Sequence, residues 1–239
     1  MAKGLRACDL VLSISRFTAG LAAEVGVSAA VLHPGVELGA PSADPAQLAA
    51  SLGVADRPVI LTAARLVPRK GHADFLAAWP AVRHRCPDAV WLIVGDGPER
   101  HRLAAATRSV DGVQLVGAVD DRTLRGLYRL ADVHLLPGRE MDGHVEGFGM
   151  AAVEAAAAGT PTVATALGGT ADAVGPGGVV VPAGDTKGLV DEVCALLLDD
   201  ERRRALAAAA LAHAESLSWP RVASRFRELV TDARERAGR

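Results

Sequence analysis

Short apolar runs alternate with longer segments of helical periodicity along most of the chain. Each run is mostly apolar rather than alternating and is bounded by Gly, Pro or Asp, which is typical of strands covered on both faces. The runs predict strands at Pro58–Ala63, Ala89–Val94, Val113–Val116, Val133–Leu136, Pro161–Thr165 and Val179–Val181. The intervening and following segments predict helices at Gly71–Arg85, Glu99–Arg108, Arg122–Ala131, Gly149–Ala158 and Asp185–Leu198. This alternation predicts an α/β fold with a doubly wound, parallel six-stranded sheet.

The two ends of the chain depart from that alternation. The first 40 residues predict a strand at Leu10–Ile14, a helix at Arg16–Val25 with Ser15 as its N-cap, and a short strand at Ala30–Leu32. A short helix then begins at Asp44-Pro45 and ends at Gly53, and two helices, Glu201–Glu215 and Pro220–Ala237, close the chain. We place a boundary within Gly35–Ala43. Residues 1–40 then belong to the end of a preceding α/β unit with its linker, and residues 41–239 form a complete unit.

Composition and charge narrow the class of protein. Of 239 residues, 50% are hydrophobic, and 26 Lys and Arg against 28 Asp and Glu give a net charge of −2. This balance argues against a nucleic-acid-binding protein, which needs a basic excess. Cys8, Cys86 and Cys194 form no CxxC pair, so we expect three small buried hydrophobic side chains. No apolar stretch approaches about 20 residues, and we expect a cytoplasmic protein without a transmembrane segment.

Ligands of open parallel sheets bind beyond the carboxyl ends of the strands, so the segments that follow each strand hold the candidate sites. Arg65 follows the first strand of the sheet, and Lys70 lies at the entrance of the next helix. Two cations beside a helix N-terminus favour an anion site. A solvated basic turn is an equally good interpretation. The Gly95-Asp96-Gly97 segment after the second strand lacks the full dinucleotide fingerprint, and we interpret it as a tight turn with Asp96 capping the next helix.

The most informative segment is a long Gly-rich loop from Pro137 that leads into an Ala-rich helix. Long loops in compact α/β domains usually have a function. Gly147 and Gly149 let a ligand approach the backbone N–H groups at the helix start. Glu146 in the loop and Glu154 on the helix are two carboxylates that could accept hydrogen bonds from two places on one polyol ligand.

Glu154 has a second interpretation, as the solvent-facing position of an amphipathic helix. Its neighbours Val153 and Ala155–Ala158 leave that helix without a polar face, however, so the carboxylate needs a partner. A metal site is disfavoured, because only His144 and Asp142 in the loop are placed to complete a ligand shell. Gly168-Gly169 fits a phosphate- or sugar-binding turn and a plain turn equally well.

Other catalytic chemistries find no support in the sequence. It contains no GxSxG, HExxH or GxxxxGK[ST] motif. Six histidines lie apart without an evident partner, and we interpret them as surface or core residues. They are His33, His72, His84, His101, His134 and His213.

An ordered set of motifs resembles a known family. The set comprises Arg65-Leu-Val-Pro-Arg-Lys70-Gly71, Val94-Gly-Asp-Gly-Pro98, Glu146-Gly-Phe-Gly-x4-Glu154, Ala158-Gly-Thr-Pro-Thr-Val163 and Gly168-Gly169. It resembles the C-terminal, donor-binding half of retaining family-4 glycosyltransferases of the GT-B fold, over roughly Ala30 to Val230. The Leu66–Trp79 run and the Gly138–Gly147 loop look most like GDP-mannose-dependent mannosyltransferases of the phosphatidylinositol mannoside type.

The resemblance implies a role for each matching residue. Arg65 and Lys70 would hold the diphosphate of a UDP- or GDP-sugar donor and stabilise the charge that develops on it. Glu146 and the backbone of Gly147, Phe148, Gly149 and Met150 would hold the sugar hydroxyls and the phosphate. Glu154 would accept hydrogen bonds from the ribose. The base would meet the backbone of Gly117, Ala118 and Val119. The resemblance further implies retention of the anomeric configuration, no cofactor and no metal.

This sequence also departs from the family pattern. Ala64 stands where Gly is common, and Gly138 where Ser or Thr is common. The family has a whole preceding acceptor domain, to which only residues 1–34 correspond here. We therefore expect a hexosyltransferase, with mannose as one candidate sugar and a sugar, lipid or small molecule as acceptor. A cytoplasmic enzyme of this kind would work at the inner membrane surface if its acceptor is a lipid.

Two other interpretations stay open. One is a nucleotide-sugar-binding module, or an enzyme half that is inactive without a separate acceptor-domain chain. The other, a sugar epimerase of the GT-B type, is disfavoured because the motif from Glu146 to Glu154 fits transferases better.

Overall fold

A computed structural model describes residues 2–237 and contains the predicted parallel sheet. Its strands are β3 (Val59–Ala63), β4 (Val90–Val94), β5 (Val113–Gly117), β6 (Val133–Leu136), β7 (Thr162–Thr165) and β8 (Gly178–Val181). Within the described residues they form one six-stranded sheet in the order β5-β4-β3-β6-β7-β8, with every neighbouring pair parallel. The chain therefore leaves β3 in one direction and returns to its other side with β6, which makes the β3/β6 junction the topological switch point.

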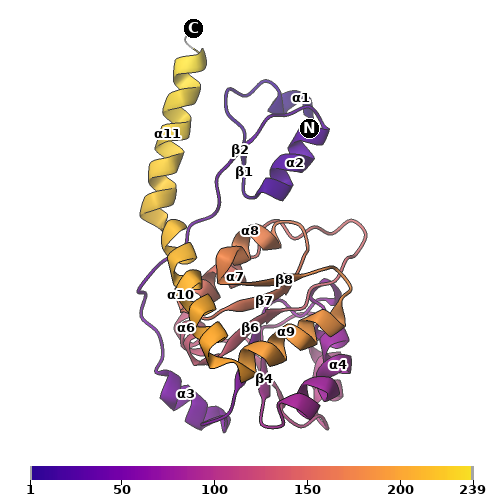
Figure 1. The fold of residues 1–239 in the computed structure, drawn as a ribbon. Coiled ribbons are helices and arrows are strands. Elements are labelled where there is room, and N and C mark those ends of the chain that lie inside the picture. Colours follow the sequence, from indigo (N-terminus) through magenta and orange to yellow (C-terminus); the bar gives the residue numbers. More distant parts are fainter. Residues whose placement is uncertain (1, 238–239) are drawn as a thin grey trace.

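Helices cover both faces of this sheet (Figure 1). The helices of the sheet unit are α3 (Pro45–Leu52), α4 (His72–Arg85), α5 (Arg100–Thr107), α6 (Asp121–Leu130), α7 (Met150–Ala157), α8 (Thr170–Val174), α9 (Thr186–Leu198), α10 (Asp200–Ser216) and α11 (Trp219–Ala237). Short 3-10 turns lie at η1 (Pro68–Lys70) and η2 (Gly175–Gly177). The predicted strands and helices agree with these bounds to within two residues.

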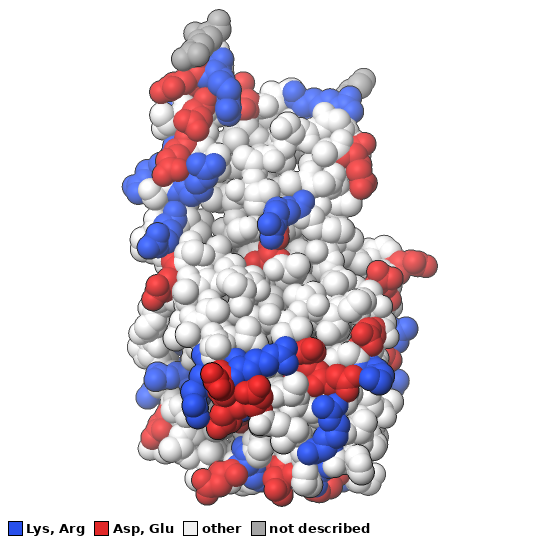
Figure 2. All heavy atoms as spheres, in the orientation of Figure 1, with Lys and Arg blue, Asp and Glu red and all other residues white. Residues whose placement is uncertain are grey.

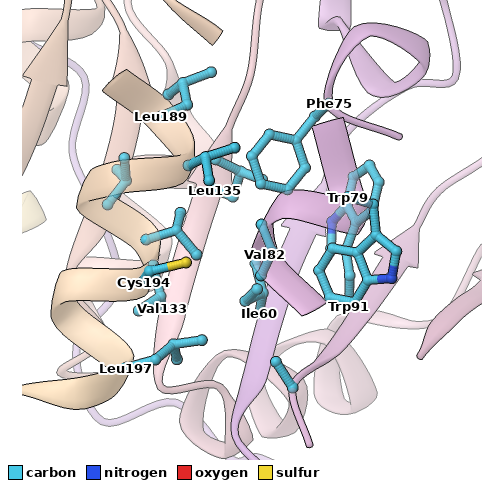
Figure 3. Close-up of a cluster of buried hydrophobic side chains, with 14 of the residues drawn as sticks. Ile60, Phe75, Trp79, Val82, Trp91, Val133, Leu135, Leu189, Cys194 and Leu197 are labelled. Carbon is cyan, nitrogen blue, oxygen red and sulfur yellow. The ribbon is translucent and has the colours of Figure 1, made fainter. Parts of the chain in front are cut away.

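The apolar runs are explained by packing on both faces of the sheet. Ile60 packs into a core with α4 and α9, and its neighbour Leu61 packs into a second core with α3, α6 and α7. In the first core Phe75 meets Trp91 edge-on, with ring centroids 5.1 Å apart, and Trp79 also packs on Trp91 (Figure 3). Strand positions on both faces are therefore covered, which explains why the strands are mostly apolar rather than alternating.

The first residues form a small separate sheet. The strands β1 (Leu12–Ser13) and β2 (Ala30–Val31) pair in parallel with each other, and helix α2 (Arg16–Glu24) connects them. Ser15 caps α2 through a capping box, as predicted. A short helix, α1 (Ala2–Leu5), precedes them and has no counterpart in the predictions. This unit contacts helix α8 of the main unit through Arg16, whose backbone N–H and guanidinium both donate to Asp172 at 2.6 Å.

Two local predictions are wrong. Asp96 does not cap α5, because the N-cap position is Glu99 and no side chain bonds there. The Asp96 carboxylate instead accepts from the N–H of Gly97 and so stabilises the turn itself. Cys8 is exposed, whereas Cys86 and Cys194 are buried as expected.

The surface charges agree with the small net charge. Lys and Arg are interspersed with Asp and Glu over the face seen in Figure 2. Among the residues that the structure describes, no helix combines the length and the apolar character needed to cross a membrane.

Candidate functional site

The β3/β6 switch point opens into a large cleft. Its volume is about 1420 Å³, and its walls are the segments that follow β3, β6 and β7. Ile14, Phe17 and Pro34 from the small N-terminal unit close the opposite side. The cleft lies beyond the carboxyl ends of the strands, where open parallel sheets bind their ligands.

An ion cluster lies on the wall of this cleft. The Lys70 ammonium lies 2.5 Å from Glu146 Oε2, and the Arg69 guanidinium donates to the same oxygen at 3.0 Å. These three side chains are 20% to 27% exposed, so the cluster is shielded without being sealed from solvent. Burial raises the pKa of Glu146, but the hydrogen bonds and charges of Lys70 and Arg69 together outweigh it and hold that pKa below its ordinary value.

Most of the predicted site residues meet in the cleft. Arg65 is exposed at its wall, and Lys70 and Glu146 lie beside it. Gly147, Phe148, Gly149 and Met150 line the same space at the start of α7, a helix that no side chain caps. The structure thus brings together cations, a carboxylate and a helix N-terminus from segments about 80 residues apart. An anionic ligand with hydroxyl groups suits this set of side chains.

Close backbone packing holds the Glu146 loop in place. The N–H of Gly169 donates to the carbonyl of Glu146 at 2.8 Å. Gly168 has a φ of +52°, and a Cβ added there would lie 2.1 Å from the same carbonyl oxygen. This contact explains both glycines as a close approach of two loops, and Gly168 also lines the cleft. The predicted alternatives, a ligand-binding turn and a plain turn, did not include this packing role.

Two sets of predicted residues lie outside the lining of the cleft. Gly117, Ala118 and Val119 lie at the end of β5, two strands away from β3. Glu154 lies farther along α7, where its Oε2 accepts a hydrogen bond from the Tyr128 hydroxyl at 3.0 Å. The expectation that this carboxylate needs a partner is therefore confirmed. Its contact with a ribose and the base contact at 117–119 stay predictions.

Other residues of interest were not singled out in the sequence. Arg69 belongs to the basic run that includes Lys70, so its charge was a usable signal. Tyr128 carries a hydroxyl on a predicted helix, and a buried tyrosine hydroxyl usually has a partner. Thr165 ends β7 in the cleft wall with its hydroxyl buried, and within the described residues that hydroxyl has no hydrogen-bond partner.

The histidines lie apart in the core, at its edge and on the surface, and His84, His101 and His144 are exposed. His72 and His134 are fully buried. His33 stacks on Phe148 with ring centroids 5.1 Å apart, and His213 contacts the carbonyl of Asp172. Among residues 2–237, no three His, Cys, Asp or Glu side chains gather as metal ligands would. Metal independence stays a prediction.

Comparison with known proteins gives a consistent result. Residues 57–199 match the family described as "Glycosyl transferases group 1". The chain is 34% identical over 241 residues to the GDP-mannose-dependent alpha-(1-6)-phosphatidylinositol monomannoside mannosyltransferase of Mycolicibacterium smegmatis, covering 95% of this chain and 63% of the relative. It is 35% identical over 227 residues to a D-inositol 3-phosphate glycosyltransferase of Thermobispora bispora, covering 87% of this chain and 51% of the relative. The chain thus spans less than two thirds of the length of these relatives.

Solved structures share the fold. A HepE protein of Anabaena in complex with UDP superimposes with a TM-score of 0.83 at 22% identity, covering 96% of this chain and 65% of that one. Sucrose-phosphate synthase from Thermosynechococcus elongatus superimposes with a TM-score of 0.78 at 25% identity, covering 97% of this chain and 60% of that one. Both chains extend beyond the part that matches this one.

Proposed function

Since the chain belongs to the group 1 glycosyl transferases, we propose that it is the donor-binding part of a retaining hexosyltransferase that uses a nucleotide diphosphate sugar. The observation that carries the proposal is the cleft at the β3/β6 switch point, with Arg65 and Lys70 beside the uncapped start of α7. Two cations and free helix N–H groups match a diphosphate. The neighbouring Glu146 matches the hydroxyls of a sugar.

The proposed reaction transfers the sugar from the donor diphosphate to a hydroxyl of the acceptor. The bond between the sugar C1 and the diphosphate oxygen breaks, and its electron pair leaves with the diphosphate. Arg65 and Lys70 stabilise the charge that develops there, which is the largest contribution that such a site makes to catalysis. An acceptor hydroxyl forms the new bond to C1 on the face that the diphosphate leaves, so the configuration is retained. Its proton passes to the departing phosphate oxygen.

The donor must compete for Lys70. Without a ligand the Lys70 ammonium is paired with Glu146, and Arg69 contacts the same oxygen. When a diphosphate replaces Glu146 as the partner of Lys70, Arg69 can still pair with the Glu146 carboxylate at the cleft wall. Glu146 is then free to accept from the sugar while its charge remains compensated.

The relatives guide the choice of donor and acceptor. We propose GDP-mannose as the first donor to test, because the mycobacterial relative is named for it. UDP-glucose is the second, because a solved structure of Anabaena HepE, which shares the fold, is a complex with it. That relative acts on a phosphatidylinositol monomannoside, so we propose a lipid-linked or inositol-based acceptor and a cytoplasmic location at the inner membrane surface. An acceptor domain would be needed to complete the cleft.

The proposed division of the chain follows the same scheme. We assign residues 41–239 to donor binding and residues 1–40 to the end of an acceptor domain with its linker. The pairing of β1 with β2 in a sheet of their own supports this division. Phe17 and Ile14 of that unit line the cleft, as an acceptor-side wall would.

Lys70→Ala is expected to weaken GDP or UDP binding by about 30-fold, or roughly 2 kcal/mol, because a charge-assisted contact to the diphosphate is lost. Isothermal titration calorimetry of both nucleotides measures this. Lys187→Ala is the matched control, because Lys187 is 86% exposed and pairs with Asp191 on the surface of α9. Equal affinities of the Lys70 variant, the Lys187 variant and the unmodified chain would remove Lys70 from the binding site.

A further inference from the structure

Tyr128 is the only tyrosine of the chain, and its side chain packs against β6. It lies on α6 and is 1% exposed. Its ring packs edge-on against His134 of β6, with centroids 5.4 Å apart and an interplanar angle of 81°. The Thr160 hydroxyl donates to the backbone carbonyl of Tyr128 at 2.5 Å. The side chain therefore has a fixed position relative to the sheet.

The Tyr128 hydroxyl forms a hydrogen bond with the Glu154 carboxylate. Tyr128 donates to Glu154 Oε2 at 3.0 Å, which links α6 to α7. Burial, followed by the nearby Glu154 charge, raises the pKa of Tyr128 well above its ordinary value. The phenol stays protonated and acts as a donor at any physiological pH. In this hydrogen bond the phenol is therefore always the donor and the carboxylate always the acceptor.

The helix that carries Glu154 offers no other polar side chain to orient its carboxylate. It lies on the Ala-rich helix α7, and its neighbours Val153 and Ala155 are apolar and fully buried. The Glu154 side chain itself is half-buried, so part of it faces outward. An ionised carboxylate offers about four lone-pair positions. The Tyr128 hydroxyl takes one of them on Oε2, and among the described residues no hydrogen bond reaches Oε1, so that oxygen can accept from a ligand.

We propose that Tyr128 is a positioning residue that fixes the rotation of the Glu154 carboxylate so that Oε1 faces the vicinal hydroxyls of a nucleotide ribose. The inference rests on the proposed function, because it takes a nucleotide as the ligand. A pre-oriented carboxylate loses less side-chain entropy when the ligand binds. Tyr128 thus contributes to ribose recognition without touching the ribose.

The test compares ligands with and without those hydroxyls. Calorimetry measures GDP and 2′,3′-dideoxy-GDP, and the corresponding uridine pair, against the unmodified chain and Tyr128→Phe. The unmodified chain is expected to prefer the ribonucleotide by about tenfold or more. Tyr128→Phe is expected to reduce this preference about fivefold, with dideoxynucleotide affinity unchanged within about twofold. In a Glu154→Gln background, Tyr128→Phe is expected to cause little further loss.

A matched control separates positioning from general stability. Thr160→Val removes a buried hydrogen bond to the same tyrosine and leaves the phenol intact. It is expected to lower the melting temperature while it preserves the ribose preference. Equal weakening of both ligands by Tyr128→Phe, or an unchanged preference, would overturn the inference while nucleotide binding stands. Failure of the unmodified chain to bind any of the four nucleotides would instead refute the proposed function.

Discussion

Gly71→Ala is expected to lower the free energy of unfolding by about 3 to 4 kcal/mol. Gly71 begins α4 with a φ of +70°, which an L side chain rarely adopts. An added Cβ would lie 1.6 Å from the carbonyl oxygen of Pro137, which follows β6. Since both partners are backbone, the turn after β3 and the loop after β6 would have to separate. These two segments are walls of the cleft, so nucleotide binding is expected to fall as well.

Gly53→Ala isolates the effect of this contact. Gly53 ends α3 with a φ of +66°, but nothing lies within 4 Å of an added Cβ. Only the cost of the left-handed conformation remains, about 1 to 2 kcal/mol. Urea denaturation of the two variants and the unmodified chain measures the difference. Similar losses of unfolding free energy for both substitutions would contradict a close backbone approach of Gly71 to Pro137.

Acid is expected to destabilise the fold strongly between pH 6.5 and 4.5 through His72 and His134. Burial, followed by the charge of Lys70, lowers the pKa of His72 to about 4 and that of His134 to about 3. Both rings are therefore neutral in the folded state. In the unfolded chain they protonate below about pH 6.5. Unfolding then takes up protons, so stability is full above pH 6.5 and is lost as the pH falls.

The expected slope approaches about 1.4 kcal/mol per pH unit for each histidine. Urea denaturation at several pH values between 7.5 and 4.5 measures it. Burial also lowers the pKa of His213, so a variant is needed to assign the effect. Both ring nitrogens of His72 lack hydrogen-bond partners within the described part of the chain, so His72→Leu is expected to keep the stability measured at pH 7. Because one titrating group is removed, the variant is expected to reduce the slope by about 1.4 kcal/mol per pH unit. An unchanged slope in this variant would contradict the assignment to His72.

The strands were predictable because each is a short, mostly apolar run between turn residues. β6, for example, coincides with the predicted Val133–Leu136. Local signals of the same kind located Ser15 as an N-cap and Gly53 as a helix end. Asp96 was assigned wrongly because the same Asp side chain can cap a helix or stabilise a turn, and sequence does not decide between them.

The ion cluster of the cleft could be predicted only in part. Lys70 and Glu146 were candidates from their local sequences, but they are 76 residues apart, and sheet order decides that they meet. The partner of Glu154 likewise comes from another helix, so the sequence indicated that a partner was needed without identifying Tyr128. Long-range contacts of this kind depend on the packing of whole elements, which no local pattern contains.

The cleft at the β3/β6 junction is expected to bind a nucleotide diphosphate sugar. Calorimetric titration of GDP-mannose and then UDP-glucose into the chain of 239 residues measures this binding. One binding site is expected for at least one of the two donors, with a dissociation constant of about 1 μM to 1 mM. Absence of binding heat for both donors and for their free nucleotides, in a sample shown to be folded, would contradict it.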